Sequence, residues 1–494
     1  MKNLKRLMTG LLTLCLLISP LCACGTSEGN DETASGTEAT ETSTEWVQDN
    51  VPDVNYGGAD FVILTQQQVD AGPKTLDDMA NGDVLDAAVW ERNRYVETRL
   101  GVTISSEQQS HEEINATVRQ CVSSGDLAYH TVFAHMVSGT QLASGGYLYN
   151  LNRLESIDKD APWWDREVGR GFEVGGALYM TAGDILPFTL LTTCCISFNK
   201  NAFNTRGLEY PYETAKNGAW TIDAMTALTE GQTYDLNGDG VIRPEDDFYG
   251  YTAHNLAAPF DFFFGSGCSM IGRDEDDMPI YEADTEKIQN VYDKLYNLVY
   301  RQNALYVKDD SGDAFFAGYR AFSEGRVLIA STYLHQIYTP SYGYKDMKDE
   351  YGLLPQPKYD LNQKEYLSFV NGAASMVTVM NLVGDEETEE YIGNVIEALG
   401  SASYNMVTYT LYELTCKAKN VNDPQSAEMV DIIIRNRVFD FGYAHFFGEG
   451  LACSTLFRDA LNAGNESISS RLKTAERQTT NALKKMTDAY AKGE

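Results

Sequence analysis

The chain has 494 residues with 71 acidic and 38 basic side chains, which gives a net charge of −33 at pH 7. Such a polyanion is repelled by nucleic acid and by anionic lipid surfaces, so neither is an expected partner. A chain of this length can form two or three domains, each with its own hydrophobic core.

The first residues have the pattern of an export signal. Residues 2–6 carry three cations, and residues 7–21 are almost wholly apolar, which is the length of a signal-peptide core and short for a membrane span. The run ends in Leu-Cys-Ala-Cys at residues 21–24, which resembles the lipobox of bacterial lipoproteins. The resemblance implies a signal peptide over residues 1–23 and a lipid on Cys24. An ordinary secretory signal with an incidental cysteine is the alternative.

Residues 24–50 are expected to form the lipidated cysteine and a flexible acidic tether. The segment is rich in Gly, Ser, Thr and carboxylates, and it has no Lys or Arg. It has too little apolar surface to offset the entropy lost on ordering. No later stretch approaches 18 uninterrupted apolar residues, so we expect the chain to be anchored to a membrane by its lipid and not to span it.

After the tether, strand and helix patterns alternate. Strands are expected at 61–64, 102–105 and 131–134, and helical apolar spacing lies between them, with Asp83 capping the first helix. This β-α-β-α-β order predicts a parallel sheet covered by helices. Ligands of such sheets bind beyond the carboxyl ends of the strands, which indicates the loop that begins at His135.

Signatures of common enzymes and of zinc sites are missing from the sequence. There is no G-x-S-x-G, no G-x-x-x-x-G-K-S/T and no H-E-x-x-H, since His111-Glu112-Glu113 lacks the second histidine. The six cysteines after the tether are scattered without a C-x-x-C pair, so zinc is not suggested and their pairing is left open. We therefore expect no catalytic residues.

Residues 235–246, DLNGDGVIRPED, have the spacing of an EF-hand-type calcium loop, with Gly240 at the sharp turn. The expected Ca²⁺ ligands are Asp235, Asn237, Asp239, the carbonyl of Val241, and Asp246. Asp246 stands where the motif usually has Glu, and its shorter side chain predicts weaker binding. Because the loop is single, we expect a structural ion that braces the fold. A turn rich in Asp and Asn without an ion is the alternative.

Aromatic side chains that cluster with polar ones suggest a carbohydrate site. The clusters are Trp163-Trp164-Asp165, Trp220, and Tyr333 with His335. Aromatic faces pack on the C–H faces of sugars, while polar groups bind the hydroxyls. Packing in the hydrophobic core is the alternative for each of them.

Six motifs occur in the order found in a known family. They are YLYNL (147–151), GALYM (176–180), ISFNK (196–200), GAWTID (218–223), FSEGR (322–326) and YGLLPQPK (351–358). Behind a lipobox and a tether, they resemble the extracellular solute-binding lipoproteins of ABC importers, in the maltose-binding-like, carbohydrate-associated group. Members of that group often carry a calcium-type accessory loop after the helix that Trp220 heads.

The resemblance implies an α/β, two-lobed periplasmic-binding-protein-like fold of type II. Each lobe is expected to be a mixed, mostly parallel sheet flanked by helices, with a hinge and an interlobe cleft. The expected first lobe comprises residues 51–187 and 326–371, and the expected second lobe comprises residues 188–325 and 372–494.

The resemblance also implies which residues face the ligand. Thr192 and Thr193 precede the crossing between lobes, Tyr333 follows a strand, and Asn371 lies where the chain recrosses. The predicted ligand-binding set is completed by His135, Trp163, Trp164 and His335. The family often has acidic residues at the positions of His135 and Thr192, so the preferred sugar is left open.

The implied function is binding without catalysis. We expect a monomer, anchored by its lipid outside the bacterial cell membrane, that traps a solute such as a sugar or oligosaccharide and hands it to the permease subunits of an ABC transporter. A secreted surface glycoside hydrolase is one alternative, and it would turn over glycans. A calcium-dependent adhesion or scaffold protein is another, and its partner binding would need Asp235.

Overall fold

The computed structural model describes residues 46–67, 84–308, 312–337, 339, 343–416, 424–446 and 453–490. The chain divides into two units, Met1–Trp46 and Val47–Glu494, and every helix and strand of the described ranges belongs to the second. The predicted signal peptide, Cys24, most of the predicted tether and the helix cap Asp83 lie outside the described residues. Among the helices of the described ranges, none is long and apolar enough to cross a membrane.

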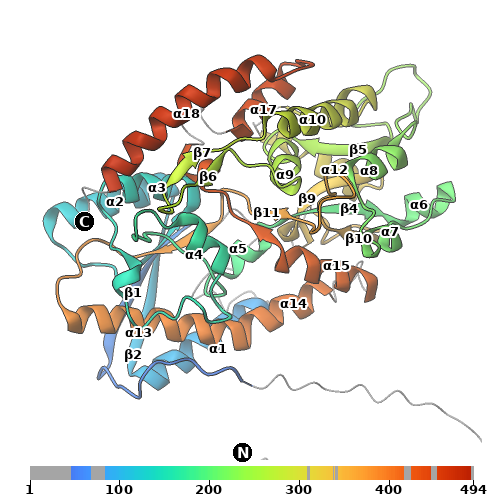
Figure 1. Ribbon diagram of the computed structural model, residues 1–494. Helices are drawn as coiled ribbons and strands as arrows, with labels where there is room; N and C mark the ends of the chain where they lie inside the picture. Colours follow the sequence, from blue (N-terminus) through green and yellow to red (C-terminus); the bar gives the residue numbers. More distant parts are fainter. Residues whose placement is uncertain are drawn as a thin grey trace, which may run out of the picture. The chain divides into compact units, whose positions relative to one another are not determined.

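A four-stranded sheet in the order β12-β3-β1-β2 forms the core of the first lobe (Figure 1). Its strands are β1 (Ala59–Gln66), β2 (Val102–Gln109), β3 (Thr131–His135) and β12 (Ser375–Thr378). β1 lies parallel to β2 and β3, and β12 runs antiparallel to β3. The predicted β-α-β-α-β order is confirmed, with α1 (Val84–Leu100) and α2 (His111–Ser124) as its helices.

Local sequence signals set the ends of these two helices. Ser110 and Glu113 form a capping box at the start of α2, and Gly125 ends that helix in the left-handed conformation. Gly101 follows α1 with a φ of 63°, and a Cβ at this position would collide with the side chain of Asn55. The turn from α1 into β2 therefore requires glycine.

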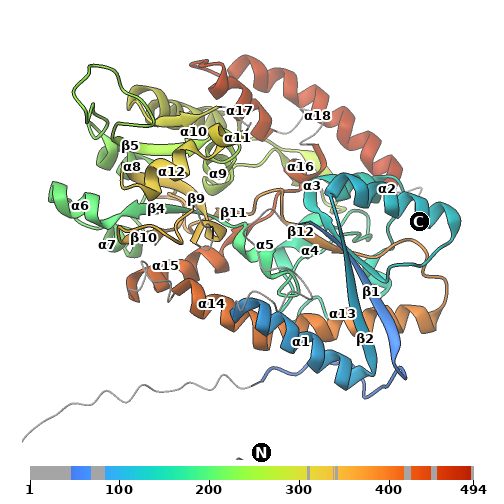
Figure 2. The same ribbon diagram turned by 180° about the vertical axis from the view of Figure 1, so that it is seen from behind.

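A five-stranded sheet in the order β10-β4-β9-β5-β8 forms the core of the second lobe (Figure 2). Its strands are β4 (Cys194–Asn199), β5 (Tyr249–His254), β8 (Leu305–Val307), β9 (Val327–Tyr333) and β10 (Tyr351–Leu354). β4 runs antiparallel to β9 and β10, whereas β5 is parallel to β8 and β9. Two mixed sheets flanked by helices are the fold class that the sequence predicts.

Helices of the second lobe follow its strands in the sequence. They are α6 (Lys200–Arg206), α7 (Tyr212–Lys216), α8 (Ile222–Thr229), α9 (Ala258–Gly265), α10 (Thr285–Tyr296), α11 (Gly312–Phe315) and α12 (Ala317–Ser323). The hydroxyl of Thr221 accepts the N–H of Ala224, so Thr221 is the N-cap of α8.

The two lobes share the chain differently from the prediction. β9 and β10 come from the segment 326–371, which was expected in the first lobe, and both pair with β4 of the second sheet. β12 comes from the segment 372–494, which was expected in the second lobe, and it pairs with β3 of the first sheet. The predicted boundaries are wrong for these strands. The reason is that β9 is buried along its whole length and needs a partner on each side, and β4 and β5 supply them.

The remaining elements connect or cover the two sheets. They are α3 (Met136–Ser144), η2 (Leu151–Arg153), α4 (Arg166–Phe172), α5 (Pro187–Leu191), β6 (Ile271–Arg273), β7 (Pro279–Tyr281), η3 (Asn297–Arg301), η4 (Leu334–Ile337), β11 (Ser368–Phe369), α13 (Glu386–Ala402), η5 (Ser403–Thr408), α14 (Tyr409–Cys416), α15 (Pro424–Arg435), β13 (Arg437–Val438), α16 (Phe441–Phe446), α17 (Cys453–Asn462) and α18 (Ser469–Tyr490).

Two helical segments reach from one lobe to the other (Figure 1). α13, η5 and α14 form one continuous run: α13 packs on α1 of the first lobe, and α14 packs on α15, which covers β10 of the second. α18 packs on α10 of the second lobe and on α3 of the first. The lobes are therefore linked by helices as well as by the strands that cross between them.

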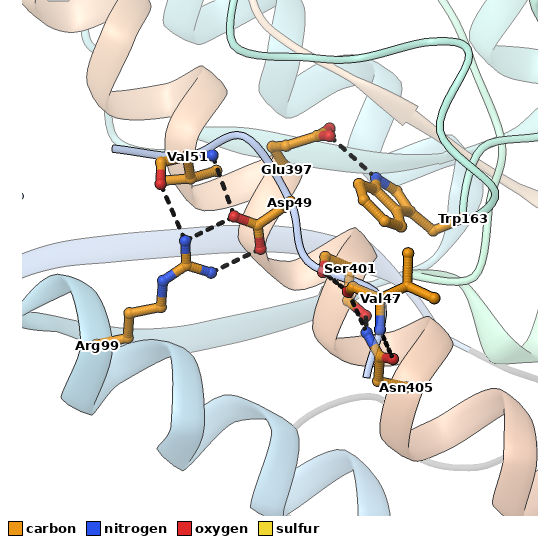
Figure 3. A network of polar contacts seen from close by, with 8 residues as sticks. All are labelled: Val47, Asp49, Val51, Arg99, Trp163, Glu397, Ser401 and Asn405. Carbon is orange, nitrogen blue, oxygen red and sulfur yellow. Dashed lines mark hydrogen bonds and ion pairs between the residues drawn. The ribbon is translucent and has the colours of Figure 1, made fainter. Parts of the chain in front are cut away.

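Residues 47–51 are fixed to the body of the protein (Figure 3). Two guanidinium nitrogens of Arg99, in α1, donate to the carboxylate of Asp49 at 2.6 Å each. The backbone of Val47 forms two hydrogen bonds with the side-chain amide of Asn405, in η5. The predicted end of the tether at residue 50 is therefore wrong, because Asp49 has a partner that the composition of the segment does not reveal.

Candidate functional site

Four of the predicted ligand-binding residues meet where the chain crosses between the two sheets. Thr192 and Thr193 lead into β4, Tyr333 ends β9, and Asn371 lies just after β11. The N–H of Asn371 donates to the carbonyl of Thr192 at 3.1 Å, and the N–H of Leu334 donates to the carbonyl of Thr193. These backbone bonds hold the crossing segments side by side.

Three aromatic rings stand together at this crossing, and we call them the ring ladder; Tyr333 and Phe188 are 6% and 7% exposed in this arrangement of the lobes. The rings of Tyr333 and His335 are stacked, with centroids 5.6 Å apart and planes 7° apart, and the ring of Phe188 lies 6.3 Å from that of His335. The amide of Asn371 donates to the Tyr333 hydroxyl at 3.1 Å, and its oxygen accepts the N–H of Ala373. The amide therefore holds the phenol in a fixed position.

Burial keeps the polar groups of the crossing uncharged at neutral pH. It lowers the pKa of His335 to about 4. Burial and then the nearby carboxyl of Asp261 raise the pKa of Tyr333 well above its ordinary value. Asp261, in α9, has no nitrogen or oxygen partner among the described residues, and its own burial raises its pKa well above the usual range. The crossing thus offers neutral donors and acceptors.

His135 lies at the carboxyl end of β3, as predicted. Its Nδ1 accepts the N–H of Ser138 at 3.3 Å, so the neutral ring carries its proton on Nε2. The ring of His111 lies 4.8 Å away. Burial, followed by the charge of His111, lowers the pKa of His135 to about 4. His135 is therefore a neutral hydrogen-bond donor at the edge of the first sheet.

The sequence prediction missed Gln66, at the end of β1. Its amide nitrogen donates to the carbonyl of Ala373 at 2.9 Å and to the hydroxyl of Ser375 at 2.7 Å, which joins the first sheet to the crossing beside Asn371. The argument that selected His135, a polar residue directly after a buried strand, applies equally to Gln66. Phe188 was also missed, because its place in the ring ladder depends on how α5 packs against η4.

Thr192 and Thr193 lie at the crossing, but their side chains do not face a ligand. Both residues are buried, and their hydroxyls donate to the carbonyls of Thr189 and Leu190 at 2.8 and 2.7 Å. The expectation that these hydroxyls bind solute is therefore wrong. They fix the turn that leads from α5 into β4.

Trp163 and Trp164 belong to the core of the first lobe. They are 3% and 5% exposed, and their indole N–H groups donate to the two carboxyl oxygens of Glu397, in α13, at 3.1 and 2.8 Å. Figure 3 shows the bond from Trp163. The core-packing alternative is the correct one for this pair. The sequence could not show this, because the acceptor lies more than two hundred residues further along the chain.

The acidic side chains of the loop 235–246 bind the loop's own backbone. The carboxylate of Asp235 accepts two backbone N–H groups at 2.6 Å each. Asp239 accepts a third and pairs with the guanidinium of Arg243. Asp247, next to the predicted ligand Asp246, closes the loop by accepting two more backbone N–H groups.

Across the described ranges, no three His, Cys, Asp or Glu side chains converge as a metal site requires. The loop does supply carboxylate, amide and carbonyl oxygens, the donors that Ca²⁺ prefers. The calcium ion therefore stays a prediction.

Solved structures are similar to this chain in fold, although no family model and no curated sequence matches it. A cyclic α-maltosyl-1,6-maltose-binding protein from Arthrobacter globiformis has a TM-score of 0.57 at 14% identity, over 87% of this chain and 100% of that one. An ABC substrate-binding protein from Listeria monocytogenes, in complex with cycloalternan, has a TM-score of 0.52 at 14% identity, over 85% and 98%. A maltose/maltodextrin-binding domain from Bdellovibrio bacteriovorus, bound to maltotriose, has a TM-score of 0.52 at 13% identity, over 85% and 99%. The chain therefore has the two-lobed, periplasmic-binding-protein-like fold of the ABC solute-binding proteins, as its sequence motifs predict.

Proposed function

We propose that the protein captures a sugar or oligosaccharide between its two lobes and delivers it to an ABC permease. The observation that carries the proposal is the ring ladder of Phe188, His335 and Tyr333, with Asn371 bound to it, at the crossing between the lobes. The fold is shared with proteins whose described ligands are maltotriose, cycloalternan and tagatose.

The chemistry of the crossing suits an uncharged, polyhydroxylated solute. Aromatic faces pack on sugar C–H groups, while the amide nitrogens of Gln66 and Asn371 hold the crossing together through Ala373, Ser375 and Tyr333. His135 donates from Nε2 without carrying a charge, because its pKa is about 4. An ionic solute would lose its hydration here without gaining an opposite charge, at a large cost in free energy.

The sequence supports a lipid anchor for this activity. In our proposal the mature chain begins at the lipidated Cys24 and stays outside the cell membrane as a monomer. A short tether raises the effective concentration of the protein near the permease, so each captured solute is delivered without a search in three dimensions. The working cycle is opening and closing of the lobes, and no bond is broken.

A thermal-shift screen tests the proposal. The chain from residue 24, with Cys24→Ser to keep it in water, is melted with monosaccharides, oligosaccharides and polyols. At least one of them should raise Tm, because a ligand at 100 times its Kd adds about 2.7 kcal/mol to the free energy of unfolding. With that solute, His335→Ala should weaken binding about tenfold, which is about 1.4 kcal/mol, through loss of the central ring.

The matched comparison uses two tyrosines. Tyr333→Phe removes the hydroxyl that Asn371 binds, whereas Tyr409→Phe alters an exposed tyrosine of α14 and should bind as the wild type does. The proposal is contradicted if both variants bind the solute equally well. It is also contradicted if no solute changes the Tm of the wild type. Release of sugar fragments from glycans during overnight incubation would indicate hydrolysis instead.

We propose separately that Ca²⁺ binds the loop 235–246 and braces the second lobe. The ligands would be Asp235, Asn237, Asp239, the carbonyl of Val241, and Asp246. Asp239 pairs with Arg243 of the same loop, so the guanidinium and the ion compete for one carboxylate.

Calcium is expected to raise Tm relative to EDTA, since an ion bound only by the folded chain stabilises it. Arg243→Gln should strengthen calcium binding several-fold by removing the competing cation. Arg320→Gln should not change it, because Arg320 pairs with Asp313, outside the loop. Asp235→Ala should abolish the calcium effect but leave solute binding intact. If calcium changes Tm in neither the wild type nor Arg243→Gln, the loop is a self-bonded turn.

A further inference from the structure

The hairpin of β6 and β7 is a part of the second lobe that touches the first. It lies between α9 and α10 in the sequence; these helices pack on each other, and α10 packs on α8 beside β5. Ile271 pairs with Tyr281 and Arg273 with Pro279, which makes a short antiparallel hairpin with Arg273 at the turn. The carbonyl of Asp277, in that turn, accepts one guanidinium bond at 2.9 Å and so orients the side chain of Arg273.

Arg273 binds the end of a helix that belongs to the first lobe. Its Nη1 donates to the carbonyl of Glu173 at 2.6 Å, and its Nη2 donates to the carbonyl of Gly171 at 2.5 Å. Both carbonyls stand at the carboxyl end of α4, and the segment after α4 is joined to β12 of the first sheet by the bridge between Thr181 and Val377. One side chain thus spans the two lobes.

The two carbonyls that accept from Arg273 suit a cation that binds reversibly. The last carbonyls of a helix have no partner inside it and carry partial negative charge, so they attract a guanidinium. Gly171 and Glu173 are partly exposed, so exchanging Arg273 for water at their carbonyls has a modest net cost. Such a contact is broken at a smaller cost in free energy than a large buried apolar contact.

An aromatic ring supports the same guanidinium. The Arg273 guanidinium lies 5.2 Å from the ring of Phe441, in α16, and that ring meets the edge of Phe172, the last residue of α4, at 6.2 Å. α16 packs on α3 of the first lobe. The ring of Phe441 therefore belongs to the surface that receives Arg273, and cation–π attraction adds to the two hydrogen bonds.

α18 also joins the lobes, through a polar contact at its start and an aromatic contact at its end. Gln289 of α10 accepts the hydroxyl of Ser469 at the start of α18, and the buried ring of Tyr490 at its end meets Tyr179 of the first lobe with centroids 5.2 Å apart. Apolar burial at that end resists separation. The contact of Arg273 is polar, shared by the lobes and replaceable by water.

We propose that Arg273 is a latch between the lobes, which favours their closed arrangement with and without a solute and slows their reopening. The inference rests on the proposed function, because a latch matters only in a protein whose lobes move apart. The latch controls how long a solute stays bound and leaves the approach of the solute unchanged.

Two measurements on the mature chain with Cys24→Ser test the latch. Stopped-flow kinetics with the solute identified by thermal shift should show about tenfold faster dissociation for Arg273→Ala and an unchanged association rate. Small-angle X-ray scattering without solute should show a larger radius of gyration for Arg273→Ala than for the wild type. Arg273→Lys should lie between them, because one ammonium group cannot donate to two carbonyls with the planar geometry of a guanidinium.

Arg320→Ala is the matched control, since Arg320 pairs with Asp313 inside its own lobe. If Arg273→Ala does not fold, Arg273→Lys takes its place in both measurements. The latch is overturned if the Arg273 variant has the same radius of gyration and the same rate of solute dissociation as Arg320→Ala. If the wild type binds no solute in the screen and Arg273→Ala still expands, the proposed function fails and the latch stands. If the wild type binds and Arg273→Ala changes neither quantity, the latch fails alone.

Discussion

Replacing Glu397 by alanine is expected to lower the free energy of unfolding by about 4 kcal/mol. Glu397 is fully buried in α13, and it is the acceptor for the indole N–H groups of Trp163 and Trp164. Alanine would leave both N–H groups buried without a partner, at about 1–3 kcal/mol each, and would open a cavity beside two large rings. The neighbourhood is closely packed, because a Cβ on Gly400 would lie 2.8 Å from Cδ1 of Trp163.

Urea denaturation followed by tryptophan fluorescence measures this effect directly. Glu397→Gln keeps one acceptor oxygen and should cost about half as much as Glu397→Ala. Glu390→Ala, on the exposed side of the same helix, is the control and should change the free energy of unfolding by less than about 0.5 kcal/mol. If Glu397→Ala is no less stable than Glu390→Ala, the carboxyl does not hold the tryptophan pair.

The second large effect is the loss, as the pH rises from about 5 to 7, of the stability that two buried carboxyls contribute. Burial raises the pKa of Glu397 to about 7 against the hydrogen bonds from the two indoles. Burial likewise raises the pKa of Asp184 to about 7 against the charge of Arg437. In the unfolded chain these carboxyls titrate near 4. The folded protein therefore keeps protons that the unfolded chain has lost, and the stability this gives disappears as the pH rises through 7.

The expected slope from these two carboxyls is on the order of 1.4 kcal/mol per pH unit each between about pH 5 and 6, and it levels off above about pH 7. The buried rings of His135 and His335, whose pKa is about 4, give a slope of opposite sign up to about pH 6.5. Urea midpoints at several pH values between 5 and 8 are therefore compared between the wild type and Glu397→Gln. Glu397→Gln cannot titrate and should remove about half of the slope, whereas Glu390→Gln should leave it unchanged. If the difference in midpoint between the wild type and Glu397→Gln does not change across the window, the raised pKa of Glu397 is contradicted.

Local patterns were enough to predict the first lobe's early elements. The strands at 61–64 and 131–134 are mostly apolar runs and the strand at 102–105 alternates buried and exposed residues, and the structure extends them by four, one and four residues, respectively. The assignment of later strands to lobes was not predictable in this way, because it depends on pairing between distant segments. Val377 of β12, for example, pairs with Phe133, and nothing in the residues around Val377 indicates that partner.

The same limit applies to the candidate site. His135, Tyr333 and Asn371 lie where the strand ends and crossings predict them. The hydroxyls of Thr192 and Thr193 donate to carbonyls three residues earlier in the chain. A comparison of motifs does not reveal such local hydrogen bonds. For the tryptophan pair the deciding contact is 234 residues away from Trp163, at Glu397, and only the folded chain brings the two together.

The contact between Asp49 and Arg99 determines where mechanical load enters the protein. Whatever precedes Val47 in the chain pulls first on a bidentate ion pair and on the Asn405 amide, and so on α1 and η5. A pull on residue 47 would be borne by α1 of the first lobe and by η5, and it would not be applied directly to the β6–β7 hairpin.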